Sequence, residues 1–232
     1  MKYQAVVFDL FGTLVDIFSR PEYDRVLSEM AAALSIPFDD FSRAWIAGGE
    51  MRTLGKVSSP MGSLIKVCHQ LRVNTTQAQL ELASKVRLDY YSRNMKPRPE
   101  AVEVLTQLKA RGCLTGLISN CASEIHESWH NTPFPALIDA PIFSCSVGFK
   151  KPDRRVFELA IAKLEVKPKN CLYVADGDSG ELKAAHNIGM DAVRIRVLYE
   201  TASNALRVDE EMWQGLTISS LAQVLELVGI VK

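Results

Sequence analysis

Four short stretches of this sequence carry side chains that can act as nucleophiles, hydrogen-bond donors or metal ligands. Asp9 ends one apolar run, Ser119-Asn120 end a second, and Lys151 stands directly before Pro152. An acidic group follows a third apolar run and consists of Asp176, Asp178 and Glu181. A bare carboxylate at the end of an apolar strand is costly unless it is paired or metal-bound, so Asp9 is expected to face a cation.

The residue types favour magnesium as that cation. The acidic group offers only oxygen ligands, which suit Mg²⁺ better than Zn²⁺. A metal shared between Asp9 and Asp176 would keep Asp9 ionised and neutralise an anionic substrate. Carboxylates attack phosphoryl groups covalently, and Lys151 and Ser119 would then stabilise the charge of the transferred group.

Each stretch alone also has a purely structural explanation. Asp followed by Gly-Thr can form a turn, and Ser119-Asn120 can cap a helix. Lys-Pro is common at a helix start, and acidic residues suit a helix N-terminus. Four such stretches in this order, each at the end of a predicted strand or the start of a predicted helix, favour a functional site.

The segments between these stretches predict a parallel sheet. Short apolar runs predict strands that end at Phe8 or cover residues 114–118, 142–147, 171–175 and 192–197. Apolar residues at helical spacing predict helices over 101–108, over 156–164, up to about 188 and over 221–228. This alternation predicts an α/β fold with a doubly wound, Rossmann-like parallel sheet. Ligands bind at the carboxyl ends of such strands, where the four stretches fall.

The segment after the first strand differs from the rest of the sequence in its hydrophobic pattern. From about residue 20 to 95 every periodic stretch is helical in spacing and no strand is predicted. We therefore expect an inserted α-helical cap domain over residues 18–96. The α/β core would consist of residues 1–17 and 97–232.

The four stretches together resemble motifs one to four of the haloacid dehalogenase superfamily, with the insertion in the place of that family's helical cap. The resemblance implies a hydrolase with Asp9 as nucleophile and Thr13, Ser119 and Lys151 as supporting catalytic residues. It implies Mg²⁺ as cofactor, bound by Asp9, the backbone carbonyl of Phe11 and Asp176. The expected substrate contacts are Gly12, Asn120 and, from the cap, Arg52 and Lys56. The roles of Asp178 and Glu181 stay open.

Phe11 departs from the phosphatase pattern. Phosphatases that this chain resembles carry an aspartate there, which acts as general acid and contributes typically about 10²–10⁴ in rate. The 2-haloacid dehalogenases have an aromatic residue at this position but lack the first acidic residue of motif four, which Asp176 retains. Two facing carboxylates need a cation, so we expect a magnesium-dependent phosphatase of a small phosphorylated metabolite. A 2-haloacid dehalogenase-like hydrolase is the alternative, and a catalytically weak binding or regulatory protein the second.

The composition limits the partners. The 232 residues carry 27 Lys and Arg against 27 Asp and Glu, with no long basic run, so neither nucleic acid nor a membrane surface is expected. No apolar run reaches about 18 residues, and the N-terminus lacks the pattern of a signal peptide. Five scattered cysteines indicate reduced thiols and a cytoplasmic protein. We expect a small, anionic substrate and a monomer or homodimer.

Overall fold

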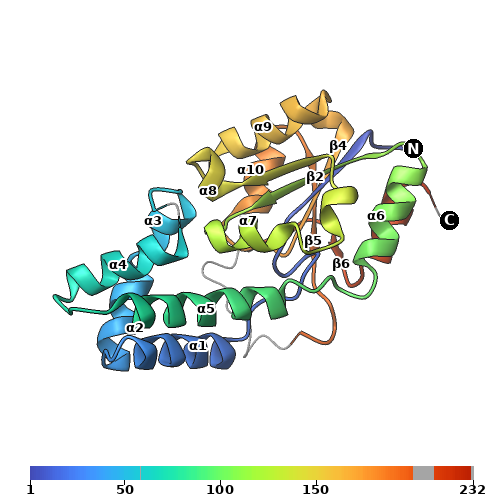
Figure 1. Ribbon diagram of the computed structural model, residues 1–232. Helices are drawn as coiled ribbons and strands as arrows, with labels where there is room; N and C mark the ends of the chain where they lie inside the picture. Colours follow the sequence, from blue (N-terminus) through green and yellow to red (C-terminus); the bar gives the residue numbers. More distant parts are fainter. Residues whose placement is uncertain (58, 201–211, 231–232) are drawn as a thin grey trace.

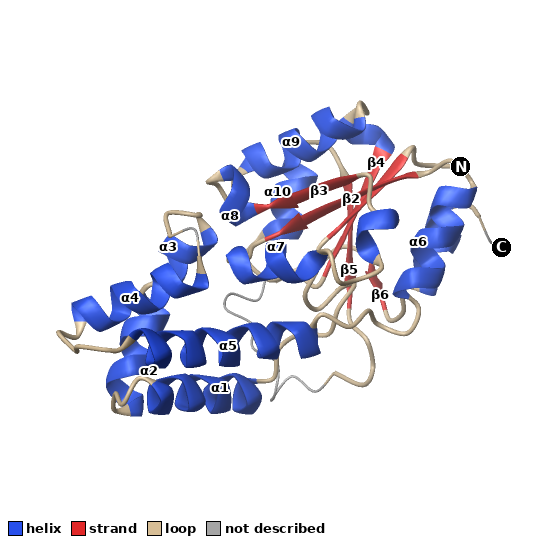
Figure 2. Cartoon of the chain, in the orientation of Figure 1, coloured by secondary structure: helices blue, strands red, loops and turns tan. Residues whose placement is uncertain are grey.

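The computed structural model describes residues 1–57, 59–200 and 212–230. Six strands form one sheet in the order β3-β2-β1-β4-β5-β6, and every neighbouring pair is parallel (Figure 2). The strands are β1 Ala5–Phe8, β2 Leu114–Ser119, β3 Ala140–Phe143, β4 Cys171–Ala175, β5 Asp191–Ile195 and β6 Thr217–Ile218. The predicted doubly wound parallel sheet is confirmed.

Helices cover both faces of the sheet (Figure 1). One face packs against α6 Ala101–Ala110, α7 Ser123–Trp129 and α11 Ala222–Val228, and the other against α9 Arg154–Leu164 and α10 Glu181–Asn187. In β1, Val6 and Phe8 point into the first layer and Ala5 and Val7 into the second. All four are fully buried, which explains why this central strand is continuously apolar in sequence.

Two predicted strands differ from the observed ones. The strand predicted over 142–147 is wrong over its last four residues, because β3 ends at Phe143 and residues Ser144–Val147 form the short helix α8. The Ser144 hydroxyl hydrogen-bonds to the backbone of Cys121, which ties the chain to the end of β2 at the point where it turns. The strand predicted over 192–197 is shifted, since β5 begins at Asp191 and ends at Ile195. The two-residue β6 was not predicted, because so short a strand shows no alternation.

Between β1 and α6 the described residues form five helices. They are α1 Arg20–Ala33, α2 Phe38–Ala47, α3 Gly49–Thr53, α4 Pro60–Gln70 and α5 Gln77–Asn94. The side chains of Ser19, Ser59 and Thr76 cap the first backbone amides of α1, α4 and α5, which explains where these helices begin. We call these five helices the helical block. The domain boundaries at 17/18 and 96/97 stay a prediction.

The helical block contacts the sheet domain through α5 against α7 and α3 against α8 (Figures 1 and 2). Arg87 of α5 forms a buried ion pair with Glu124 of α7, at 3.3 Å. The loop after α3 lies so close to α8 that a Cβ on Gly55 would overlap the carbonyl oxygen of Cys145. None of the described helices is long and apolar enough to cross a membrane.

Candidate active site

The loop after β1 holds Asp9 by backbone hydrogen bonds. The Asp9 amide donates to the carbonyl of Val174 at 2.9 Å, so Asp9 continues the pairing of β1 with β4. The amides of Leu14 and Val15 then both donate to the Leu10 carbonyl, which folds the chain back over the strand end. Within this turn the Thr13 hydroxyl donates to Asp9 Oδ2 at 3.2 Å. The structure therefore brings the predicted pair Asp9 and Thr13 together.

Gly12 is needed in this loop for two reasons. Its φ of +81° lies in the left-handed region, which side chains disfavour. A Cβ on Gly12 would also overlap the carboxylate of Asp176. The absence of a side chain therefore lets the Asp176 carboxylate lie directly against the loop that carries Asp9.

Lys151 joins two carboxylates. Its buried ammonium donates to Asp9 Oδ1 and, at 2.6 Å, to Glu181 Oε2. Burial alone would lower the pKa of Lys151, but the two carboxylates raise it above its ordinary value, so the lysine is charged at neutral pH. It can therefore stabilise negative charge that develops beside Asp9.

Asn120 positions Lys151 from the end of β2. Its side-chain amide donates to the Lys151 carbonyl at 3.1 Å and accepts from the Lys151 amide at 2.8 Å. The sequence predicted Asn120 as a substrate contact. These two bonds orient the lysine, and the expected contact of Asn120 with the substrate stays a prediction.

Glu181 belongs to the site, a role that the sequence left open. Besides Lys151, it accepts hydrogen bonds from the Tyr173 hydroxyl at 2.7 Å and the Gly177 amide at 3.2 Å. Burial raises the pKa of Glu181 to about 8 against the opposing effect of Lys151. Tyr173 was not predicted, because it lies within an apolar strand and nothing in the sequence marks its hydroxyl.

Three carboxylates meet at this rim of the sheet. One carboxylate oxygen each from Asp9, Asp176 and Glu181 lies within 4.8 Å of the others, and all three side chains are buried. Burial raises the pKa of Asp9, and the nearby Asp176 adds to the shift while Lys151 opposes it. Among the described residues, the Lys151 ammonium and the Arg196 guanidinium lie beside these carboxylates, and Arg196 lies 3.9 Å from Asp176 Oδ2. Three neighbouring carboxylates that offer only oxygen donors fit a divalent cation such as Mg²⁺.

Comparison with known proteins places the chain in a family. Residues 3–189 match the haloacid dehalogenase-like hydrolases. The chain belongs to this family. It is 30% identical to (S)-2-haloacid dehalogenase of Pseudomonas fluorescens, over 80% of this chain and 81% of the relative. It is 24% identical to glyceraldehyde 3-phosphate phosphatase of Methanocaldococcus jannaschii, over 99% and 98% of the two chains.

A longer curated relative and a solved structure also resemble the chain. The chain spans 18% of the length of mouse acyl-CoA dehydrogenase family member 10, to which it is 24% identical over 84% of its own length. It superimposes on a HAD phosphatase of Thermococcus onnurineus with a TM-score of 0.65 and 20% identity, covering 97% of this chain and 98% of the other. The relatives thus include both phosphatases and dehalogenases, and they establish a hydrolase fold without selecting between these reactions.

Phe11 of this haloacid dehalogenase-like hydrolase packs toward the helical block. Its ring centroid lies 4.4 Å from that of Phe18, and Phe18 lies 5.3 Å from Tyr90 and 5.5 Å from Tyr91 of α5. The position where the family's phosphatases carry an acid is therefore part of an aromatic cluster. The cluster contains two tyrosines, and burial raises their pKa values above the ordinary value.

The predicted cap contacts differ in their placement. Arg52 is buried, its guanidinium lies 4.0 Å from the ring centroid of Trp45, and it has no ion pair with a described residue. Lys56 is exposed and likewise has no ion pair in the described part of the chain, and its expected contact with the substrate stays a prediction. Arg87 was missed by the sequence analysis, because it lies in a helix whose pattern indicated only packing. It also faces Trp45, at 5.1 Å.

The remaining predicted residues lie at the same rim. Ser119 is buried at the end of β2, and because Phe8 pairs with Leu117, Ser119 is level with residue 10 beside the Asp9 loop. Asp178 accepts a hydrogen bond from the Ser179 amide at 2.9 Å, which supports the turn before α10. The metal contact expected for the Phe11 carbonyl stays a prediction.

Proposed function

We propose that this chain is a magnesium-dependent phosphatase that acts on a small anionic substrate through Asp9. The observation that supports it best is the buried group of Asp9, Asp176 and Glu181, whose carboxylate oxygens lie within 4.8 Å of one another and are the kind of ligand that Mg²⁺ prefers. A dehalogenase binds an anionic acid without a metal and would meet repulsion from Asp176. A divalent cation removes that repulsion and favours a substrate rich in phosphate oxygens.

In the proposed reaction each residue of the site has a separate role. Mg²⁺ held by Asp9 and Asp176, with the Phe11 carbonyl as the expected third protein ligand, would neutralise the charge of the phosphoryl group. An Asp9 carboxylate oxygen would attack phosphorus, the bond to the leaving oxygen would break, and an aspartyl-phosphate would form. Lys151 and the Ser119 hydroxyl would stabilise the equatorial oxygens, and water would then release phosphate from Asp9.

Phe11 limits the leaving group in this proposal. Its side chain has no proton to give to the departing oxygen, and it packs on Phe18. We therefore propose acyl or aryl phosphates, whose leaving oxygens need no protonation, as the favoured class. Alkyl phosphates would react more slowly by up to about the 10²–10⁴ that general acid catalysis contributes.

The buried arginines of the helical block support an anionic substrate. Arg52 and Arg87 are both buried beside Trp45, and Arg87 pairs with Glu124 but has no hydrogen-bond partner for its Nη1. Arg52 has no ion pair among the described residues, so its positive charge is uncompensated in that part of the chain. We propose that Arg52 contacts the part of the substrate that leaves.

A 2-haloacid dehalogenase-like reaction is the second candidate. The aromatic Phe11 and the 30% identity to a dehalogenase favour it. In that case Asp9, kept ionised by Lys151 and Thr13, would attack carbon and halide would leave without a proton. A protein that binds its ligand with little turnover is the third.

One assay separates the three. Release of phosphate from an aryl phosphate is measured with Mg²⁺ and with a chelator, for wild type and Asp9→Asn, beside halide release from a 2-haloacid. The proposal expects phosphate release that needs Mg²⁺ and disappears in Asp9→Asn. Halide release that persists in chelator would contradict it, and absence of both products would favour the binding protein.

A further inference from the structure

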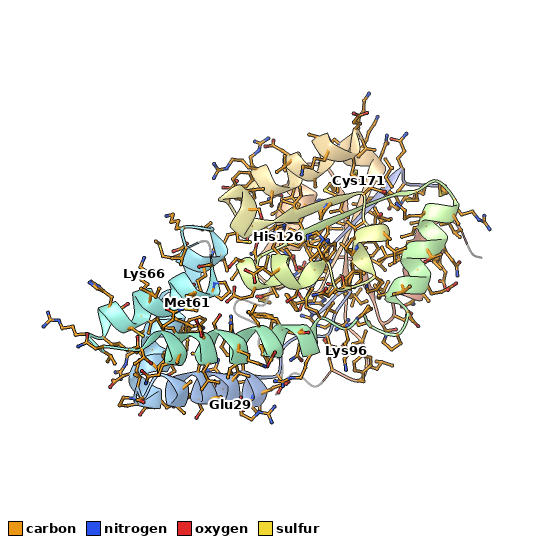
Figure 3. The ribbon with its side chains drawn as sticks, in the orientation of Figure 1. Glu29, Met61, Lys66, Lys96, His126 and Cys171 are labelled. Carbon is orange, nitrogen blue, oxygen red and sulfur yellow. The ribbon has the colours of Figure 1, made fainter. Side chains whose placement is uncertain are left out.

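A tyrosine hydroxyl is buried in the sheet domain close to Lys151. Tyr173 lies in β4, the strand that pairs with β1 and whose first residue, Cys171, is labelled in Figure 3. The Tyr173 side chain is fully buried, and its ring meets Phe157 of α9 edge to face, with the centroids 5.3 Å apart. A buried hydroxyl costs free energy unless it is hydrogen-bonded, and a phenylalanine would make the same apolar contacts. Packing alone therefore does not explain a tyrosine at this position.

The hydroxyl bonds to the carboxylate that also holds Lys151. It donates to Glu181 Oε2 at 2.7 Å, and the Lys151 ammonium donates to the same oxygen at 2.6 Å. The Gly177 amide donates to the other oxygen, Oε1, at 3.2 Å. These three donors hold both oxygens of the buried Glu181 carboxylate, and the Tyr173 hydroxyl fixes the oxygen that Lys151 uses.

The contacts continue from Glu181 to Asp9. The Lys151 ammonium donates to Asp9 Oδ1 as well as to Glu181, so it is held between two carboxylates. Asn120 fixes the Lys151 backbone, but the ammonium is at the end of a long, flexible side chain. The place of that ammonium relative to Asp9 therefore depends on where Glu181 Oε2 lies.

We propose that Tyr173 is a positioning residue that sets the place of the Lys151 ammonium through Glu181. This rests on the proposed function in one respect, the role given there to Lys151 in stabilising charge that develops beside Asp9. A charge that is already in place stabilises a transition state better than one that must move during the reaction. Burial raises the pKa of Tyr173 well above its ordinary value, so its hydroxyl keeps its proton and donates.

Tyr173→Phe in the full chain removes the hydroxyl alone. We expect kcat to fall about 10- to 100-fold, as for a lost hydrogen bond to a charged group, while KM stays nearly unchanged because the effect lies in the transition state. Turnover is followed as release of phosphate or of halide, whichever the wild type shows, since Lys151 contacts Asp9 in either reaction. A rise in KM with unchanged kcat would overturn the proposal.

Tyr3→Phe is the matched control. The buried Tyr3 donates to Asp191 Oδ2 at 2.6 Å, so this variant also loses a bond from a tyrosine hydroxyl to a carboxylate. Urea unfolding measures the structural cost of each variant, and only Tyr173→Phe should lose turnover. An equal fall of kcat in both variants would show a general structural effect and contradict the positioning role.

A double variant tests the path through Glu181. Glu181→Ala removes the acceptor, so adding Tyr173→Phe to it should lower kcat little further. Losses of kcat that multiply fully in the double variant would show that Tyr173 acts by another route, and would overturn the proposal.

The ammonium itself gives a readout that needs no turnover. Its heteronuclear NMR signal, in protein isotope-labelled at lysine, is the one that is missing from Lys151→Arg. We expect slow exchange of its protons with water in wild type and in Tyr3→Phe, and faster exchange in Tyr173→Phe. Equal exchange in all three proteins, or fast exchange already in wild type, would overturn the proposal. If the phosphatase proposal fails, this signal still decides the role of Tyr173.

Discussion

Phe11 is the residue that sets the leaving group in this account. Phe11→Asp restores an acid two residues after Asp9 and should raise kcat/KM for an alkyl phosphate by as much as about 10²–10⁴, with a smaller gain for an aryl phosphate. The ratio of the two kcat/KM values is the measurement. Phe11→Asn loses the same contact with Phe18 but cannot give a proton, so it is the matched control. An equal gain in both variants would contradict the acid explanation.

Gly12 tests the metal site without removing a ligand. Gly12→Ala places a Cβ where the Asp176 carboxylate lies, in addition to a backbone cost of roughly 1–2 kcal/mol at positive φ. We expect Mg²⁺ affinity, measured by calorimetry, to fall at least tenfold while the protein stays folded. Gly112→Ala is the control, because it has a φ of +74° and nothing within 4 Å of its Cβ. Equal Mg²⁺ affinity in both variants would contradict the account.

Asp9, Ser119 and Lys151 were predictable because each follows a strand, ends one or precedes a helix in the sequence pattern. Asp9, Thr13 and Lys151 converge as expected because parallel strands bring their carboxyl ends to one rim. Tyr173 and Arg87 were missed because their polar ends are carried by side chains on apolar faces, and their partners Glu181 and Glu124 follow 8 and 37 residues later in the chain. Such pairing depends on tertiary packing and leaves no local pattern.

At the scale of elements, Asp139 fixes the approach of β3 to β2. It accepts from the Thr115 amide at 2.9 Å, from the Thr115 hydroxyl at 3.0 Å and from Lys109. Burial alone would raise the pKa of Asp139, but these donors lower it. Because the folded pKa is depressed, the stabilisation is complete above the unfolded value of about 3.9 and is lost as pH falls through the folded value.

Asp139→Asn should therefore be less stable than wild type near pH 7, and the difference should shrink as pH falls below about 4. Urea unfolding at several pH values measures it. Asp191 at the start of β5 is a second carboxylate with a lowered pKa, there mainly through the Tyr3 hydroxyl, and Asp191→Asn tests it in the same way. If the destabilisation of Asp139→Asn did not change with pH, altered hydrogen bonding or packing would be responsible rather than the lost charge.

The same elements show where the sequence pattern fails. The run 142–147 is apolar enough for a strand, yet the chain leaves the sheet at Ser144 because its hydroxyl bonds to the Cys121 backbone. That contact joins segments 23 residues apart. The parallel sheet itself was predictable, since its buried strands are apolar on both faces.

At the scale of the whole molecule, the Arg87–Glu124 pair joins the helical block to the sheet domain. Both side chains are at most 3% exposed, so Glu124→Leu leaves an unpaired buried cation and should lower the free energy of unfolding by about 3–5 kcal/mol. Arg87→Met combined with Glu124→Leu should recover most of that loss. Asp40→Ala breaks the exposed pair with Arg43 and should cost less than about 1 kcal/mol. A double variant as unstable as Glu124→Leu would contradict the pairing.

The most direct test of the central claim is to identify what is attached to Asp9 during a single turnover. Enzyme in excess is mixed with an aryl phosphate and Mg²⁺, quenched in acid and digested, and the peptide that contains Asp9 is examined by mass spectrometry. The account predicts one phosphoryl group on Asp9, present only with Mg²⁺ and absent from Asp9→Asn. An organic ester on Asp9 after reaction with a 2-haloacid in chelator, with no phosphoryl adduct under any condition, would contradict it.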